Sequence, residues 1–176
     1  MRARLNKRCL LLGGLIFALA ACEPGVVSKG AGFQRNYVVS RKALEAGNYE
    51  VAIKGYGVMI ESAGPLEPRL RLEYAHALLR ANRFAEAARI SGALAQRLKG
   101  SDRAAALAVR GTAEHEMALA AMANGDYGPQ TKKRLLSARA ALAEMLKTDA
   151  ELDPLGAMAS RHRDIASELA TVAKRG

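Results

Sequence analysis

The chain has 176 residues, of which half are hydrophobic and only 5% are aromatic, and its formal net charge is +10 at pH 7. This length accommodates one domain. The surplus cations are spread along the chain and accompany no motif that reads a nucleic-acid groove. The composition therefore argues against nucleic acid as a partner and favours anionic lipid headgroups or an acidic protein surface.

Residues 1–21 carry the features of a secretory signal in the usual order. Four cations lie among the first eight residues, and an apolar run of 13 residues follows from Cys9 to Ala21. A helix that spans a bilayer needs about 20 apolar residues, so this run is too short to be one. Cleavage after residue 21 would remove four cations and lower the net charge from +10 to +6.

The end of this segment, Leu19-Ala20-Ala21-Cys22, resembles the lipobox of bacterial lipoprotein precursors. The resemblance implies that the chain is cut before Cys22, that the thiol receives a diacylglycerol, and that the new amine is acylated. Several acyl chains together give a stable membrane anchor. The resemblance also implies the outer membrane, facing the periplasm, because Glu23 is not the Asp that favours inner-membrane retention in enteric lipoproteins. The alternative is an ordinary signal peptide that happens to end at a Cys.

Residues 22–33 are expected to be the lipidated Cys followed by a flexible tether, because Pro24, Gly25, Gly30 and Gly32 lie close together there. Residues 34–176 then form the folded domain. With Cys9 removed and Cys22 acylated, this domain holds no cysteine for a disulfide or a metal site.

A short motif recurs in the domain: a small residue, a turn-forming Asn or Gly, and an aromatic residue. The aromatics are Tyr49, Phe84 and, in a looser third copy, Tyr127; the first two lie 35 residues apart. Asn and Gly tolerate the left-handed conformation that ends a helix. We therefore expect helices to stop at Gly47-Asn48, Asn82 and Asn124-Gly125, with the aromatic starting the next helix.

This pattern resembles the tetratricopeptide repeat family, in the Gly/Asn turn, the aromatic, and a small residue one turn later at Ala52 and Ala87. The third copy departs from it, since Gln130 follows where a small residue belongs. The resemblance implies an all-α fold of antiparallel helix hairpins, stacked as a short solenoid with a C-terminal capping helix. The alternative is an alanine-rich helical bundle with chance similarity.

Apolar residues at spacings of three and four predict the helices in chain order. The first hairpin is expected from about Asn36 to Ala63 and the second from about Leu70 to Leu98, with Gly100 as a stop. The third combines helices over about residues 103–123 and 130–147. A last amphipathic helix begins near residues 152–154 and caps the array.

No catalytic constellation is present, so we expect neither an enzyme nor a cofactor. Glu114-His115-Glu116 is the nearest approach to a metal cluster, but adjacent helical residues point in different directions. The His that a zinc-protease helix needs four positions after His115 is Leu119. An exposed helical histidine is the simpler reading, and we expect no metal site.

In the repeat family the first helix of each hairpin lines a concave surface that holds a peptide. Carrying that arrangement over to this chain yields one candidate set: Tyr37, Arg41, Arg69, His76, Arg80 and His115. Arginines on such a wall would bind a carboxylate or an acidic segment through forked donors. The alternative is that these are ordinary surface residues.

Together these features predict a lipid-anchored, periplasm-facing adaptor that docks another envelope protein or peptide. Repeat lipoproteins of this kind resemble accessory factors of secretion, of pilus assembly (Tad-type) and of outer-membrane assembly. A second possibility is a regulator that binds and activates a cell-wall enzyme.

Overall fold

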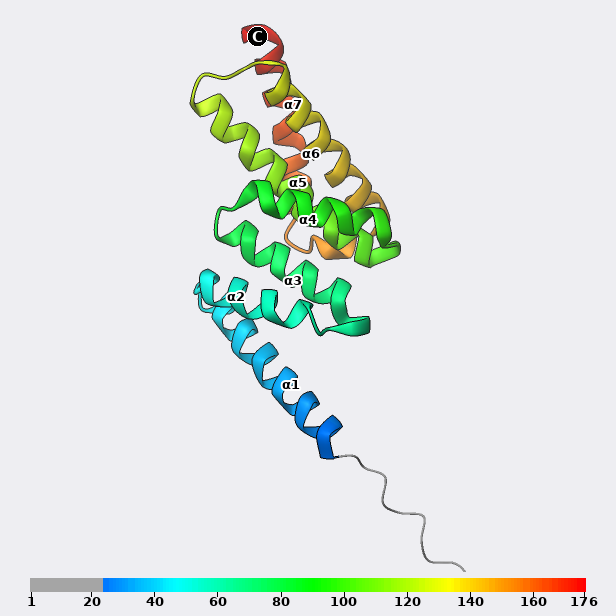
Figure 1. The fold of residues 1–176 in the computed structure, drawn as a ribbon. Helices are drawn as coiled ribbons and strands as arrows, with labels where there is room; N and C mark the ends of the chain where they lie inside the picture. Colours follow the sequence, from blue (N-terminus) through cyan, green and yellow to red (C-terminus); the bar gives the residue numbers. More distant parts are fainter. Residues whose placement is uncertain (1–23) are drawn as a thin grey trace, which may run out of the picture.

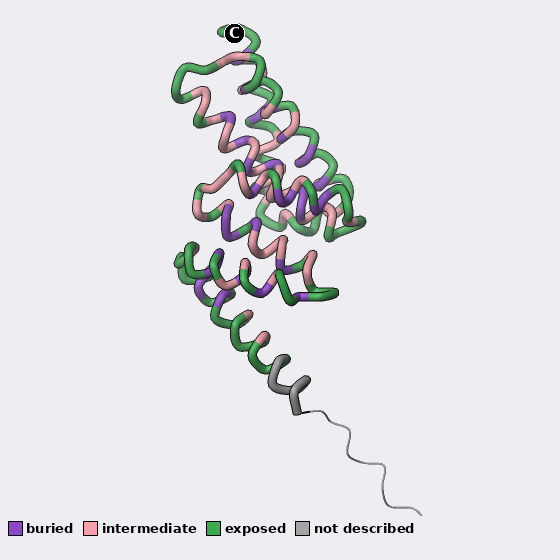
Figure 2. The backbone as a smooth tube through the Cα atoms, viewed as in Figure 1, coloured by how far each residue is buried: buried purple, intermediate pink, exposed green. Residues whose placement is uncertain are grey.

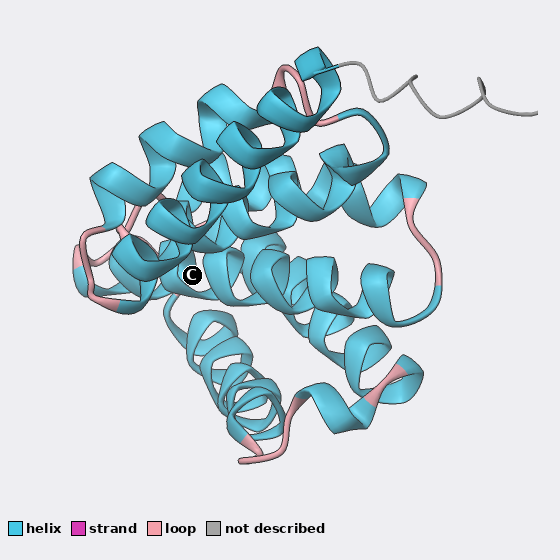
Figure 3. Ribbon diagram, turned by 90° about the horizontal axis from the view of Figure 1, so that it is seen from below, coloured by secondary structure: helices cyan, strands magenta, loops and turns pink. Residues whose placement is uncertain are grey.

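The structure, a computed structural model, describes residues 24–176, with side chains from residue 30 onward. The predicted signal, the predicted lipidation site Cys22 and Glu23 lie outside the described residues. The described chain is helical throughout and contains no strand (Figures 1 and 3), which confirms the all-α class. The elements are α1 (Pro24–Glu45), α2 (Tyr49–Ile60), η1 (Gly64–Leu66), α3 (Glu67–Arg80), α4 (Phe84–Arg97), α5 (Gly100–Ala123), α6 (Pro129–Thr148), η2 (Ala150–Leu152) and α7 (Ala157–Arg175).

Each helix packs mainly against the helices before and after it in the chain, and the contact between α5 and α6 is the most extensive. The array therefore has two distinct ends. Helix α1 stands at one end, and the C-terminus of α7 lies at the other (Figure 1).

Three helices end as their turn residues predicted. Gly47, Asn82 and Gly125 have φ angles of 80°, 60° and 80°, in the left-handed region. In each turn the next residue donates its backbone N–H to the carbonyl five positions back, at N···O distances of 2.8, 2.9 and 2.9 Å (Asn48 to Ala43, Arg83 to Leu78, Asp126 to Ala121). This is the Schellman arrangement, which satisfies carbonyls that the helix end leaves without partners.

Helix α1 begins at Pro24 and runs through the segment expected to be a flexible tether. Proline is well tolerated in the first turn of a helix, where its missing N–H would have no partner. Gly30 and Gly32 keep helical backbone angles and have no neighbouring atom within 4 Å of a Cβ position. The glycines weaken the helix without ending it, because no residue here takes a left-handed turn.

The second hairpin ends differently from the expectation that Gly100 stops a helix. Helix α4 already ends at Arg97, and Leu98 and Lys99 are extended. Gly100, with φ of 54°, opens α5 instead. The chain therefore enters α5 through two extended residues and a glycine in the left-handed conformation.

The core consists of two adjoining clusters of buried side chains. The larger runs through α1 to α6 and includes Ala52 and Ala87, the small residues that follow the turn aromatics, both fully buried. The smaller joins α5, α6 and α7 around Leu135, Leu142 and Ile165. Figure 2 shows buried positions along the inward faces of the helices, while the described first turns of α1 are mostly exposed.

Helix α7 is attached at both ends. At its start, the Asp153 carboxylate accepts hydrogen bonds from the backbone N–H groups of Met158 and Ala159, at 3.0 and 2.9 Å. These bonds hold the pKa of Asp153 below its ordinary value. At its end, Arg175 donates to the Tyr127 hydroxyl at 2.8 Å.

Candidate partner-binding surface

Five of the six predicted residues lie on two helices, Tyr37 and Arg41 on α1 and Arg69, His76 and Arg80 on α3. Glu73 links these helices, because its Oε1 accepts from Arg41 Nη1 at 3.0 Å and from the Tyr37 hydroxyl at 3.5 Å. Sequence reasoning missed Glu73, although it lies four residues after Arg69 and three before His76. We call these six residues, Glu73 included, the α1–α3 surface.

Arg41 is already occupied by acidic neighbours. Its Nε donates to Glu45 at 2.7 Å, and its Nη1 pairs with Glu73. The hydrogen bond to Glu45, and then the charge of Glu73, raise the pKa of Arg41 above its already high ordinary value. The sequence predicted that Arg41 would offer its forked donors to a partner, but Glu45 and Glu73 already occupy some of them. A carboxylate of the partner must therefore compete with these two glutamates.

Arg80 is engaged by an aromatic residue rather than by an acid. Its Nη2 donates to the Tyr49 hydroxyl at 2.9 Å, and its guanidinium carbon lies 5.5 Å from the centroid of the Tyr49 ring. This contact ties the last turn of α3 to the first residue of α2. Such a cation–π pair contributes about 0.5 to 1 kcal/mol at an exposed site.

Arg69 differs from both, because within the described chain its side chain has neither an ion pair nor a hydrogen bond. It borders a shallow pocket of about 220 Å³ whose other lining residues are Phe33, Tyr37, Leu66 and Leu70. Leu66 is half exposed there, whereas Leu70 belongs to the core. An apolar floor with one cation at its edge suits an apolar side chain that carries a carboxylate nearby.

His76 lies on the exposed side of α3, between Glu73 and Arg80. Partial loss of water around its imidazole lowers the pKa of His76 below its ordinary value; Glu73 opposes this shift and Arg80 reinforces it. The residue is therefore neutral at pH 7 and can both donate and accept a hydrogen bond.

His115 is not on this surface, and the expectation that it is an exposed helical histidine is wrong. It is buried, with 3% of its surface exposed, because α7 covers it. Its Nε2 lies 2.6 Å from Glu168 Oε2, and its Nδ1 lies 2.8 Å from Arg161 Nη1. A guanidinium can only donate, so Nδ1 accepts and the Nε2–H is directed to Glu168. His115 fastens α7 to α5.

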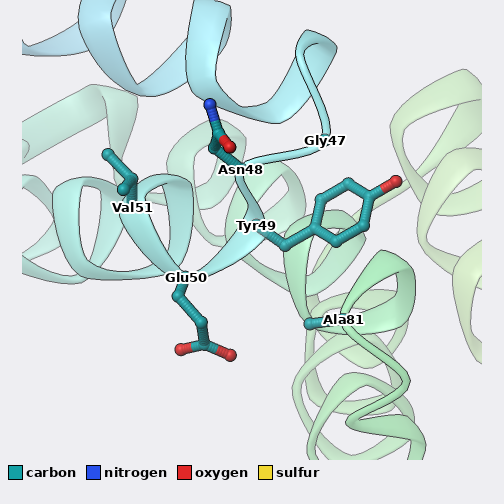
Figure 4. Close-up of a pocket in the computed structure, with 6 residues that line it drawn as sticks. All are labelled: Gly47, Asn48, Tyr49, Glu50, Val51 and Ala81. Atoms are coloured by element: carbon teal, nitrogen blue, oxygen red, sulfur yellow. The ribbon is translucent and has the colours of Figure 1, made fainter.

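A second depression of about 410 Å³ lies where the first turn meets the end of α3, lined by Gly47, Asn48, Tyr49, Glu50, Val51 and Ala81. Figure 4 shows that the side chains of Asn48, Glu50 and Val51 point in three different directions. Their polar groups do not converge on a common point, so this depression has no arrangement for holding a small ligand.

No group of three or more His, Cys, Asp or Glu side chains within residues 24–176 is placed to hold a metal ion. In the same part of the chain, no helix combines the length and the apolar character needed to cross a membrane.

Comparison of the chain with known proteins does not assign it to a family. No protein-family model, curated protein or solved structure matches the chain.

Proposed function

We propose that this protein is an exported, lipid-anchored adaptor whose helical hairpins form a short tetratricopeptide-like array that docks another protein of the bacterial envelope. The observation that supports the proposal is the α1–α3 surface, where Glu73 accepts hydrogen bonds from Tyr37 and Arg41 and where Arg69 borders an apolar pocket. Binding by shape and charge is the activity that such a surface supports.

The repeated contacts of the turn aromatics favour an array of related hairpins. Arg80, in the last turn of α3, lies over Tyr49 at the start of α2. Arg175, in the last turn of α7, lies 5.1 Å from the Tyr127 ring centroid, just before α6. In both cases the arginine comes from the helix that follows the hairpin. Helix α7 thus contacts the turn aromatic of the third hairpin in the same way that α3 contacts that of the first. Stacked repeats would require such equivalent contacts.

The proposed anchor and helix α1 together suggest how the docking surface is presented. Acylated Cys22 would hold the chain at a membrane, in our proposal the periplasmic face of the outer membrane, two residues before the first turn of α1. With a rise of 1.5 Å per residue, Tyr37 then lies about 20 Å along the helix from its start. The adaptor would offer its surface at a set distance from the bilayer.

The test is affinity capture of the lipidated protein from envelope membranes after crosslinking, with partners identified by mass spectrometry. We expect Arg69→Glu to lose the partner, because the single cation beside the apolar pocket becomes an anion. Arg89→Glu is the matched control, since Arg89 is exposed on α4 and has no ion pair within the described chain. Cys22→Ala tests the anchor separately.

The possible outcomes distinguish the functions considered. An envelope-assembly subunit that is recovered with the parent and with Arg89→Glu, but not with Arg69→Glu, supports the adaptor. Equal recovery with both arginine variants, at unchanged helicity, removes the α1–α3 surface as the docking site. A cell-wall synthase or hydrolase as the captured partner would replace the adaptor with a regulator.

A further inference from the structure

The outward side of α6 combines exposed cations with exposed apolar residues. Four cations lie there at helical spacing, Lys132, Lys133, Arg139 and Lys147, and all are exposed. Between them along the helix are Leu136, which is 49% exposed, and the exposed Ala140 and Ala143. We call these seven residues the α6 outer face.

The cations of this face have no acidic partners in the described chain. Several arginines elsewhere are paired with acids, as in Arg41 with Glu73 and Arg110 with Glu114. The only acid within α6 is Glu144, and Arg103 of α5 already binds it at 2.6 Å. The face therefore carries a positive charge that nothing on the neighbouring helices neutralises.

The middle of the face is apolar and low in profile. Leu136, Ala140 and Ala143 follow one another at spacings of four and three, so they form a single stripe along the helix. Alanines let a second helix approach closely, and a half-exposed leucine can insert beside its backbone. Lys132 and Arg139 lie on one side of this stripe and Lys133 on the other, where flanking charges select a partner in paired helices. Lys147 continues the stripe at its C-terminal end.

We propose that the α6 outer face binds an amphipathic helix of another protein, one whose apolar stripe is flanked by Asp and Glu. A second copy of this chain does not fit through the same face, because the cations would face cations. A bilayer fits less well, because one leucine and two alanines offer little apolar area for insertion. From Lys132 to Lys147 the face extends about 22 Å, which is four helical turns.

This inference does not depend on the proposed adaptor surface or on the anchor. The α6 outer face belongs to the third hairpin, and α1 stands at the opposite end of the array (Figure 1). Loss of binding at one surface therefore leaves the other to be tested by itself.

The experiment measures binding of the full chain, in neutral detergent, to a fluorescent synthetic peptide of about 18 residues, long enough for four to five turns. The peptide has a Leu/Ala stripe flanked by glutamates. We expect the double variant Lys132→Glu with Arg139→Glu to weaken binding about tenfold, since two attractive pairs become repulsive. Lys42→Glu with Lys54→Glu, an equal change of charge on α1 and α2, should bind as the parent does.

A charge exchange makes the test specific for this face. A peptide with lysines in place of the glutamates should bind the Lys132→Glu, Arg139→Glu variant better than the parent chain. Leu136→Ala should weaken binding of the acidic peptide without changing the net charge.

Three results would overturn the proposal. One is equal binding of a scrambled peptide in which the glutamates surround the helix, since that reports only net charge. Another is equal weakening by the α1 and α2 control variant. The third is that neither the parent nor any variant binds the peptide, while the parent binds phosphatidylglycerol vesicles and the α6 variant does not. That result would assign the face to a bilayer.

Discussion

Replacing Gly111 with alanine tests the close approach of α5 and α6. Gly111 is buried in α5, where α5 packs against α6. A Cβ there would lie 2.7 Å from Leu142 Cγ, 2.9 Å from Leu142 Cδ2 and 3.1 Å from the Ala138 carbonyl oxygen. Leu142 is fully buried and the third atom is backbone, so neither can yield without moving α6.

Two opposing effects decide the size of the change. Alanine favours a helix interior over glycine by about 1 kcal/mol. Overpacking a core costs about 1 to 3 kcal/mol, and contacts this short with a buried side chain and backbone belong in the upper half of that range. We therefore expect Gly111→Ala to lower the free energy of unfolding by about 1 to 2 kcal/mol.

Denaturant unfolding, followed by far-UV circular dichroism, measures this change, and Gly32→Ala is its control. Gly32 is exposed in α1 with no atom near a Cβ, so there the propensity gain acts alone and stability should rise. In a Leu142→Ala background the two shortest contacts disappear, and Gly111→Ala should cease to destabilise. If Gly111→Ala stabilises the parent chain as much as Gly32→Ala does, the close approach of α5 and α6 is refuted.

Three further predictions concern polar groups and use the same unfolding measurement. Tyr56→Phe should stabilise the fold by about 1 kcal/mol, because the buried Tyr56 hydroxyl has no hydrogen-bond partner. His115→Ala should destabilise it by about 2 to 3 kcal/mol, because Glu168 loses its partner in a mostly buried site. Acid should weaken the attachment of α7. The folded pKa of Asp153 is lowered, so its contribution is complete above the ordinary Asp pKa of about 3.9 and disappears as the pH falls through the folded value.

Each of these has a matched variant and a contrary outcome. Tyr49→Phe, which removes a bonded hydroxyl, should destabilise; a stability loss in Tyr56→Phe as well would mean that its hydroxyl has a partner. His115→Gln can still donate to Glu168 and should lose less than His115→Ala; equal losses would assign the effect to volume alone. Asp153→Asn should lose less unfolding free energy than the parent when the pH is lowered. An equal loss in both proteins would contradict the role of Asp153.

Features that depend on a few consecutive residues could be predicted without the structure. The ends of three helices were predictable at Gly47, Asn82 and Gly125, because a Schellman turn needs only one residue that tolerates positive φ and a carbonyl five positions back. The all-α class followed from apolar spacing. The placement of five candidate residues on two helices, α1 and α3, followed from the predicted helix ranges, and their role in binding stays a prediction.

Only the tertiary structure decided which of those residues are available to a partner. His115 is buried because Glu168 and Arg161, 53 and 46 positions away, are brought onto it by α7. Arg41 is occupied because Glu73, 32 positions away, reaches it from α3. Local pattern reports which face of a helix a residue occupies, whereas burial and ion pairing depend on which other helix packs there, and that is settled by contacts between residues far apart in the chain.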